Sequence, residues 1–260
     1  MSSKDKVLEI LENNKEDFTS GAAIASSLGI SRNAIWKAIN ELRKDRYTIE
    51  AISNKGYKLS SSSDIVSVPG IHSFMDDSTK KLFTDINVYD TLASTNRTAK
   101  EMAIAGAKSY TTVIAGSQTV GRGRRDHSFY SPEGGIYMSV ILRPDVLSLT
   151  ENDAITLATG NAVCTAIAGV TGLSPTLKPI NDLYIDDKKI CGILTEAGTE
   201  FETGEVHWIV IGIGINFNSD ILAFPEGIKN RATSLYAPGD APISKNQLIA
   251  EILKQLSLLK

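Results

Sequence analysis

The chain has 260 residues, of which 42% are hydrophobic and 22% charged, and its formal net charge is −3. It can bury a substantial core and hold more than one domain. No apolar run approaches the roughly 20 residues that cross a bilayer, and the polar start MSSKDKVLEI lacks the apolar segment of a signal peptide, so we expect a cytoplasmic protein. Cys164 and Cys191 lie in apolar surroundings, which favours buried thiols over a disulfide, and with three scattered histidines the sequence shows no metal-ligand cluster.

The first part of the chain has a helix-turn-helix pattern. Apolar residues at helical spacing predict helices from Lys4 to Asn13, from the N-cap Ser20 to Gly29, and from the N-cap Ser31 onward. The buried stripe of the third helix is expected to comprise Ile35, Trp36, Ile39 and Leu42. The alternating stretch YTIEAISNKGYKL then predicts a β-hairpin that turns at residues 54–56. Three helices followed by a hairpin resemble a winged helix-turn-helix DNA-binding domain.

Charge supports the same interpretation. Residues 1–60 hold ten Lys or Arg against eight Asp or Glu, a net charge of +2, and residues 31–46 alone carry +3. A basic helix face is also typical of a solvated surface, and small three-helix domains also bind proteins. DNA is favoured because polar and basic residues occupy the early turns of the third helix, where side chains meet bases and phosphates. The residues expected to contact DNA are Ser31, Arg32, Asn33, Lys37 and, in the hairpin turn, Lys55. Because so weak a net charge neutralises few phosphates, we expect the domain to bind DNA as a dimer.

A serine run, SSSSD at residues 60–64, interrupts these patterns and predicts a flexible linker. We therefore divide the chain into a DNA-binding domain of residues 1–60, a linker of residues 61–67 and a second domain of residues 68–260.

The second domain has an α+β pattern. Strands are predicted at INVYDTL, TTVIAGSQT, GIYMSVILRP and VHWIVIGIGINFN, and DLYIDDKKICGILTEAG predicts a hairpin near Asp186-Asp187. Helices are predicted from Thr95 to Ala105 and from Asp153 to Val170. This order indicates a mixed sheet backed by helices and differs from the strand-helix alternation of a Rossmann fold.

Two glycine-rich stretches lie in this domain. GRGRRDHSFYSPEGG, residues 121–135, crowds Arg122, Arg124 and Arg125 onto a flexible backbone, where they repel one another unless an anion orders the loop. It lacks the Gly-Lys-Ser/Thr ending of a phosphate-binding P-loop, so this stretch taken alone favours a surface phosphate patch or a mobile loop over a catalytic loop. The stretch 212–216, GIGIN, lacks the third glycine and following helix of a dinucleotide site, and its glycines are expected to allow a close backbone approach.

Five motifs occur together in order: STN at 94–96, SQTVGRGRR at 117–125, KPINDLY at 178–184, KICGIL at 189–194 and GIGINFN at 212–218. Their order and spacing resemble those of biotin protein ligases. With the winged helix in front, nearly the whole chain is similar to the bifunctional ligases that also repress the biotin operon. The resemblance implies a class II synthetase-like catalytic domain that forms biotinoyl-5′-AMP from biotin and ATP. It also implies transfer of biotin to a lysine of the biotin carboxyl carrier domain of acetyl-CoA carboxylase, and a homodimer promoted by ligand that binds operator DNA.

The resemblance also assigns roles to residues. Lys189, Arg122 and Arg124 are expected to be catalytic, with Lys189 reaching the biotin carboxylate and the α-phosphate. The expected biotin-binding residues are Ser94, Thr95, Asn96, Gln118, Gly121, Arg122, Lys189 and Gly192. The expected ATP-binding residues are Arg124, Arg125, Phe129, Lys178, Asn181, Asp182 and Asn216, and Asp182 is also the expected Mg²⁺ ligand.

The chain departs from the family pattern in three places. Residues 178–182 read KPIND where the family usually has Lys-Trp-Pro-Asn-Asp, which changes the turn that aims Asn181 and Asp182. His127 and Phe129 stand where an arginine and a tryptophan are common. The segment 244–260, SKNQLIAEILKQLSLLK, predicts a final helix with Ser244 as N-cap, and nothing corresponds to the family's small C-terminal β-barrel. The absence of a Gly or Asn cap before Lys260 suggests a natural chain that continues, although fraying of a terminal helix gives the same pattern.

Two other functions stay open at this point. The altered 178–182 turn and the missing barrel favour a repressor that senses biotin or its adenylate without ligase activity, whereas the intact arginine-glycine loop and Lys189 favour catalysis. A lipoate-type ligase is the second alternative. Gln118 beside Ser94 and Thr95 suits a polar bicyclic ring better than a dithiolane.

Overall fold

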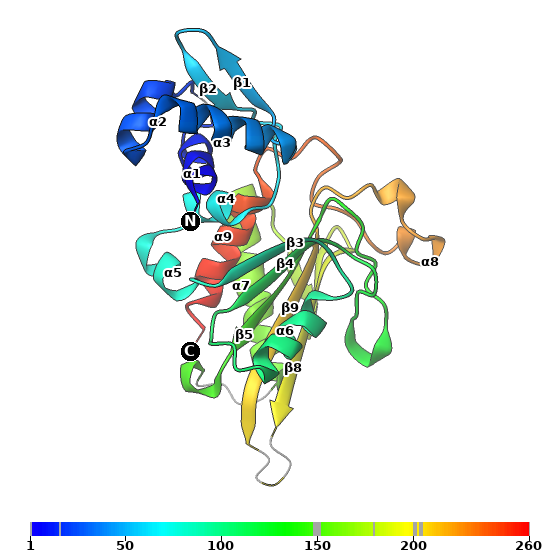
Figure 1. Ribbon diagram of the computed structural model, residues 1–260. Coiled ribbons are helices and arrows are strands. Elements are labelled where there is room, and N and C mark those ends of the chain that lie inside the picture. The colour runs from blue at the N-terminus through cyan, green and yellow to red at the C-terminus, as the bar shows by residue number, and fades with distance from the viewer. Residues whose placement is uncertain are drawn as a thin grey trace. The chain divides into compact units, whose positions relative to one another are not determined.

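The computed structural model describes residues 2–15, 17–147, 152–178, 180–199, 202 and 205–259. It divides into two compact units, Met1–Asp76 with Lys245–Ala250, and Asp77–Ser244 with Glu251–Lys260. The domain boundary that we expect at residues 61–67 therefore falls within the first of these units, and it stays a prediction. Most of the helices and strands are labelled in Figure 1, and the two units are described separately below.

The first unit contains the three helices and the hairpin that the sequence predicts. They are α1 (Ser3–Asn13), α2 (Gly21–Leu28), α3 (Arg32–Lys44), β1 (Ile49–Ile52) and β2 (Gly56–Leu59), followed by the short α4 (Val68–Ser73). Ser20 and Ser31 cap α2 and α3 by accepting hydrogen bonds from backbone N–H groups three residues on, and Gly29 ends α2 with φ +65°. The core comprises Val7, Leu8, Leu11, Ile24, Ile35, Ala38, Ile39, Leu42, Tyr47, Ile49 and Leu59.

One core prediction is wrong. Trp36 was expected in the buried stripe of α3, but 57% of it is exposed. Trp36 follows the buried Ile35 directly, so it points roughly 100° further round the helix, away from the other buried positions. A tryptophan on the open face of this helix becomes a candidate for contact with a partner.

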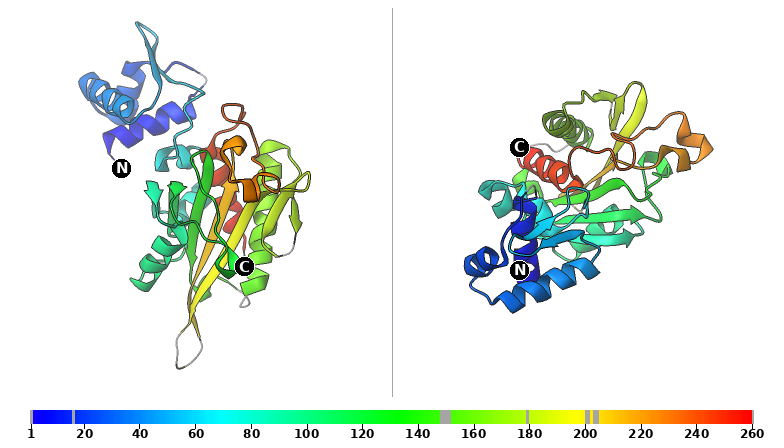
Figure 2. Two further views of the ribbon diagram at one scale, coloured as in Figure 1. Left: turned by 90° about the vertical axis from the view of Figure 1, so that its right-hand side faces the viewer. Right: turned by 90° about the horizontal axis from the view of Figure 1, so that it is seen from above.

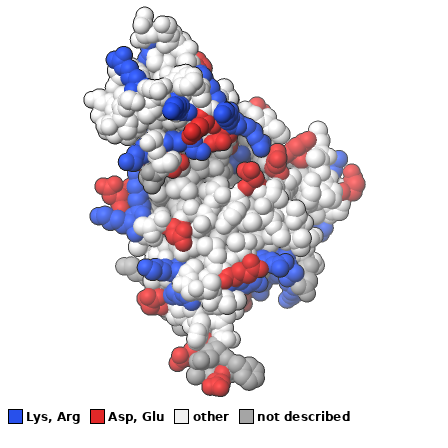
Figure 3. Space-filling model, viewed as in Figure 1, with Lys and Arg blue, Asp and Glu red and all other residues white. Residues whose placement is uncertain are grey.

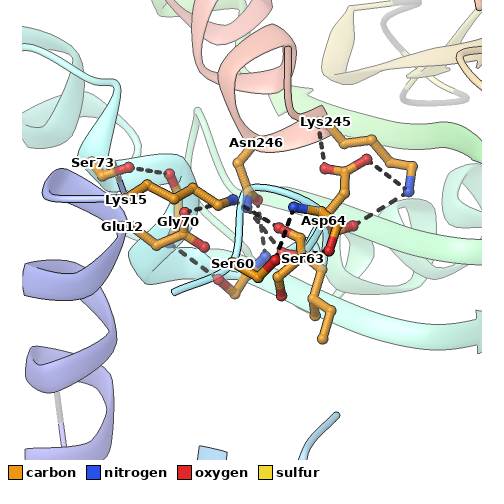
Figure 4. Close-up of polar contacts among 12 residues, drawn as sticks. Glu12, Lys15, Ser60, Ser63, Asp64, Gly70, Ser73, Lys245 and Asn246 are labelled. Carbon is orange, nitrogen blue, oxygen red and sulfur yellow. Dashed lines mark hydrogen bonds and ion pairs between the residues drawn. The ribbon is translucent and has the colours of Figure 1, made fainter. Parts of the chain in front are cut away.

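The serine-rich segment is held by side chains of the first unit (Figure 4). Lys15 Nζ donates to the Ser63 carbonyl at 2.7 Å, and the backbone N–H of Lys245 donates to Asp64 Oδ1 at 2.7 Å. The Asn246 amide binds backbone groups on either side of residue 66, accepting from one N–H and donating to one carbonyl. Composition alone predicts a flexible linker here, whereas the structure gives these backbone groups specific partners.

The second unit is built on one seven-stranded sheet in the order β3-β4-β5-β9-β8-β7-β6. The strands are β3 (Ile86–Leu92), β4 (Thr112–Gln118), β5 (Gly135–Leu142), β6 (Thr176–Lys178), β7 (Asp182–Ile185), β8 (Lys188–Thr199) and β9 (Val206–Asn216). Among these seven described strands β3 and β4 pair in parallel and the other neighbours pair antiparallel, so the predicted mixed sheet is confirmed. All eight residues of the interior strand β5, which lies between β4 and β9, are buried, which places the core against this part of the sheet.

Helices cover both faces of this sheet, α6 (Thr95–Ile104) one face and α7 (Asn152–Thr171) the other, as Figures 1 and 2 show. Successive side chains of a strand point to opposite faces of a sheet. Thr195 of β8 is hydrogen-bonded to Thr156 of α7, whereas the next residue, Glu196, is hydrogen-bonded to Asn96 of α6, so the two helices lie on opposite faces. The final helix, α9 (Lys245–Leu256), begins in the first unit and ends in the second, and it buries Leu248, Ile249, Ile252, Leu253 and Leu256, as its spacing predicts. Short helices α5 (Asp77–Leu82) and α8 (Glu226–Lys229) complete the unit, with 3-10 turns at Arg124–Asp126, Pro144–Val146 and Ile221–Ala223.

One described helix, Asp153–Thr171, is long and apolar enough to cross a membrane by length and composition alone, where the sequence analysis expected none. Its mean hydropathy is 1.4, and 44% of it is buried inside the protein. Core helices of globular proteins meet the same criterion, so the finding is weak evidence for a membrane span.

Candidate active site and DNA-binding surface

All five sequence motifs meet around one cavity of about 190 Å³ in the second unit. It is bounded by the start of α6, the end of β4, the arginine-glycine loop, the start of β7, and the middle of β8 and β9. The residues that line it are Ser94, Thr95, Asn96, Gln118, Arg122, Gly123, Arg124, His127, Ser128, Phe129, Asn181, Asp182, Lys189, Gly192, Ile193, Leu194, Gly212, Ile213 and Gly214.

One end of the cavity is neutral and polar. Gln118 Oε1 accepts from the backbone N–H of Thr95 at 2.7 Å and lies 3.1 Å from Thr95 Oγ1. Gln118 Nε2 donates to Ser131 Oγ at 2.9 Å. Ser94 occupies the N-cap position of α6, but its side chain makes no capping hydrogen bond. This end therefore offers fixed, uncharged donors and acceptors in a setting largely removed from water, which suits a small polar ring.

The other end is charged. Lys189 Nζ lies 2.7 Å from Asp182 Oδ1, and about 30% and 25% of the two side chains are exposed. The ammonium also lies 5.7 Å from the centre of the Phe129 ring. Asn181 is fixed on β8 by a backbone hydrogen bond from Ile193 at 2.8 Å and by its own amide, which donates to the Ile193 carbonyl at 3.1 Å. An anion that enters this end competes with Asp182 for the Lys189 charge.

The arginine-glycine loop closes on itself as a narrow hairpin. The Phe129 N–H donates to the Gly121 carbonyl at 2.9 Å, and the Gly123 N–H donates to the His127 carbonyl at 2.7 Å. Arg125 lies in the left-handed region with φ +52°. Arg124 makes an exposed ion pair with Asp153 at 3.4 Å, which contributes little stability. The loop is thus ordered by its own backbone, while the Arg122 side chain at the cavity rim is exposed.

The two glycines of the GIGIN stretch allow the close approach that the sequence predicts. A Cβ at Gly212 would overlap the side chain of Asn96, and one at Gly214 would press against the ring of Phe129. Glycine at these positions therefore lets α6 and the arginine-glycine loop lie directly on β9.

We expect Gly212→Ala to lower the free energy of unfolding by about 1–3 kcal/mol, because the new methyl group must displace the buried Asn96. Urea unfolding measures this change. The matched control is Gly169→Ala on α7, where a Cβ meets nothing within 4 Å, and alanine there should raise stability by up to about 1 kcal/mol. Equal effects of the two substitutions would contradict the close contact at Gly212.

Not every expected site residue lines the cavity. Lys178 pairs with Asp187 at 2.9 Å, and Asn216 donates to the Thr233 carbonyl at 2.9 Å. Arg125 and Gly121 also lie outside the lining, although Gly121 supports the loop that forms part of it. Pro179, the departure in the 178–182 motif, lies outside the described residues.

Sequence reasoning did not assign several lining residues. These are Gly123, His127, Ser128, Ile193, Leu194, Gly212, Ile213 and Gly214. His127 was noted only as a departure from the family pattern and was given no role. Most of the others are glycines or apolar strand residues, whose types carry no chemical signal, and the pairing of β8 with β9 brings the two strands together under the loop. Neither cysteine is in a disulfide. Cys191 is buried and burial raises the pKa of its thiol, while Cys164 is partly exposed rather than buried as expected.

In the first unit, the expected DNA-contacting residues lie on an exposed surface. Arg32, Asn33 and Lys37 are exposed on α3, Lys55 is exposed in the hairpin turn, and the Ser31 hydroxyl caps the helix. A groove of about 500 Å³ lies between the start of α3 and the hairpin. On the face shown in Figure 3, basic side chains of this unit are interspersed with acidic ones.

The fold and the cavity define a protein ligase of the biotin and lipoate type, preceded by a helix-turn-helix domain. Residues 88–216 match the biotin/lipoate A/B protein ligase family, and residues 4–58 match the HTH domain family. The chain is 38% identical to the bifunctional ligase/repressor BirA of Bacillus subtilis over 248 residues, which cover 95% of this chain and 75% of that protein. It is 28% identical to the bifunctional ligase/repressor BirA of Escherichia coli, over 96% of this chain and 74% of that protein.

Solved structures agree with these relatives. Biotin protein ligase from Aquifex aeolicus in complex with biotin and ATP superposes with a TM-score of 0.57 and 30% identity, covering 67% of this chain and 69% of that one. The Leishmania major biotin protein ligase in complex with biotinyl-5-AMP superposes with a TM-score of 0.54 and 26% sequence identity. The match covers 67% of this chain and 74% of that one. The chain belongs to the biotin protein ligase family, in its bifunctional ligase/repressor branch.

Proposed function

We propose that this protein activates biotin with ATP, transfers it to a lysine of the biotin carboxyl carrier domain of acetyl-CoA carboxylase, and represses biotin synthesis genes by binding operator DNA in the cytoplasm. The observation that carries the proposal is a single cavity with a neutral polar end at Thr95 and Gln118 and a cationic end at Lys189. This separation suits a ligand with an uncharged polar ring and an ionised carboxylate.

In the first step, the biotin carboxylate attacks the α-phosphorus of ATP, and the bond from that phosphorus to the pyrophosphate oxygen breaks. Both reactants are anions, so positive charge must offset their repulsion. Lys189 supplies it at the charged end of the cavity, and Arg122 and Arg124 supply it from the arginine-glycine loop. In the second step, the acceptor lysine amine attacks the biotinyl carbonyl carbon, AMP leaves with its bonding electrons, and the nitrogen loses a proton. No protein nucleophile is needed.

The charged end also fits a magnesium ion. Mg²⁺ is commonly held by one or two carboxylates together with substrate phosphates. Asp182 supplies one carboxylate in the lining, and no group of three acidic, His or Cys ligands exists among the residues that the structure describes. Asp182 would hold the ion, which would supply further neutralisation of the phosphate charge.

Phe129 and Asn181 are the lining residues proposed to contact the nucleotide, and the roles expected of Gly121, Arg125, Lys178 and Asn216 stay predictions.

Transfer of labelled biotin to a biotin carboxyl carrier domain tests the ligase proposal. We expect labelling that requires ATP and that lipoate does not replace. Biotin binding without adenylate formation would instead indicate a sensing repressor without ligase activity, and labelling with lipoate would indicate the other ligase type.

On the DNA side, we propose that Arg32, Asn33 and Lys37 contact the operator through the exposed face of α3, with Lys55 in the hairpin turn on an adjacent phosphate. Trp36 lies on the same open face and offers an apolar surface to a thymine methyl group or a sugar. A dimer would place two copies of α3 on a palindromic operator.

Substitutions at neighbouring positions separate these contributions. Lys37→Ala should lower the dependence of log K on log salt by about one unit, because one phosphate contact is lost. Trp36→Ala should weaken operator binding at every salt concentration while leaving that slope unchanged. Fluorescence anisotropy titrations across a salt series measure both, and a reduced slope for Trp36→Ala would contradict its apolar role.

A further inference from the structure

A chain of hydrogen bonds, buried at Ser139 and partly buried at Glu196, extends from the polar end of the cavity to residues that do not line it. We propose that Glu196 of β8 is a positioning residue for the ligand ring, since it fixes the direction of these hydrogen bonds and thereby makes Thr95 and Gln118 a pair of acceptors for a ring N–H. The inference rests on the proposed function, because it takes biotin as the ligand.

The chain begins at Asn96, which is only 6% exposed. Its amide nitrogen donates to Glu196 Oε2 at 2.8 Å and to the Leu194 carbonyl at 3.2 Å. A carboxylate and a carbonyl can only accept, so the NH₂ group must face them. The amide oxygen of Asn96 then faces Ser139 Oγ at 2.7 Å.

The next link is Ser139, which is fully buried on β5. Its oxygen lies 2.7 Å from Asn96 Oδ1 and 2.8 Å from Thr95 Oγ1, but it has a single proton. The amide oxygen can only accept, so that proton points at Asn96. The short contact with Thr95 then requires the Thr95 hydroxyl to donate to Ser139.

This direction changes what Gln118 offers. With its proton on the Ser139 side, Thr95 Oγ1 cannot also donate to Gln118 Oε1, which lies 3.1 Å away. Gln118 is itself held in place, because its nitrogen donates to Ser131 Oγ, whose proton goes to the Phe129 carbonyl at 2.9 Å. Two acceptor oxygens therefore lie 3.1 Å apart at the cavity, and an N–H of a cyclic urea can satisfy both. A dithiolane ring has no such group.

Because of Lys100, the role of Glu196 requires a carboxylate with two acceptor oxygens. Its Nζ donates to Glu196 Oε1 at 2.7 Å, which leaves Oε2 for Asn96. In Glu196→Gln the single amide oxygen is drawn to the Lys100 ammonium, and the new NH₂ group faces Asn96. Asn96 must then turn over, Ser139 donates to Thr95, and the acceptor pair is lost. Removing the ammonium as well, in Glu196→Gln with Lys100→Met, frees the Gln oxygen for Asn96 and restores the original direction.

Calorimetry of biotin binding without ATP tests the proposal on the full chain. We expect Glu196→Gln to weaken binding about tenfold or more, and the double variant to bind within about threefold of the wild type. The rate of pyrophosphate release at saturating biotin should stay within about twofold in both. Glu101→Ala is the matched control, since it removes a carboxylate of α6 that pairs only with the exposed Arg97 in the contacts seen here. Thermal unfolding confirms that each variant is folded.

Wild-type affinity in Glu196→Gln, or no recovery in the double variant, would overturn the positioning role while leaving the proposed function intact. If the wild-type protein binds no biotin, both the proposed function and this inference are wrong.

Discussion

Lys189→Ala is expected to slow pyrophosphate release about 100-fold or more while weakening biotin binding only slightly. The ammonium acts where the carboxylate and the α-phosphate meet, so its charge matters most as the negative charge of the two reactants is brought together. The neutral end of the cavity, at Thr95 and Gln118, is unchanged by the substitution and continues to hold the ring. A loss confined to the rate, with ring binding intact, is the signature of an interaction made mainly in the transition state.

A release assay at saturating biotin, paired with calorimetry, separates the two effects. Lys188→Ala provides the control, because Lys188 is the exposed neighbour of Lys189 and does not line the cavity. A Lys189→Ala protein that releases pyrophosphate at the wild-type rate would remove Lys189 from the role we give it. Loss of Asp182's partner is a further consequence of this substitution, so Lys189→Arg, which keeps the charge, should recover part of the rate.

Biotin and ATP together are expected to tighten operator binding at least tenfold, about 1.4 kcal/mol of coupling. The winged helix is weakly basic, so one copy neutralises few phosphates and two copies on one palindrome bind far better. The arginine-glycine loop is closed by its own backbone hydrogen bonds and has Arg122 exposed at the cavity rim. An adenylate in the cavity would attract the side chains of Arg122 and Arg124 and thereby change the surface of the arginine-glycine loop. We expect this change to favour the dimer.

Anisotropy with a palindromic operator at one fixed salt concentration measures the coupling, and non-specific DNA of equal length is the control. Lys189→Ala should lose the part of the enhancement that needs ATP, because it forms the adenylate slowly. Equal operator affinity with and without the two ligands would show that the DNA-binding and ligase functions are not coupled.

The longer elements of the fold could be predicted from the sequence because each has a clear period and a recognisable end. Ser20, Gly29 and Ser31 mark the helix-turn-helix by their capping chemistry, and β3 begins and ends at the predicted residues. Elements such as α8 and β6 have only four and three residues, too few for a period to show. The prediction for Trp36 is wrong because the angular position of a residue on the helix, rather than its apolar type, decides whether it is buried.

The candidate site likewise contains residues that the sequence predicts and residues whose role only the fold shows. Lys189, Arg122 and Gln118 each lie in a short contiguous motif, so the resemblance to biotin protein ligases predicts them as site residues. All three line the cavity. Ser139 and Glu196 lie in strands that read only as buried sheet, and their role depends on the register that sets Ser139 and Leu194 opposite Gly212. A polar network that joins distant segments through strand pairing leaves no local pattern in the sequence.

The exchange of labelled pyrophosphate into ATP tests the central claim most directly, because it reports adenylate formation without an acceptor protein or DNA. The account predicts exchange that requires biotin, is not supported by lipoate, and falls about 100-fold in Lys189→Ala. No biotin-dependent exchange by a folded protein that binds biotin would contradict it.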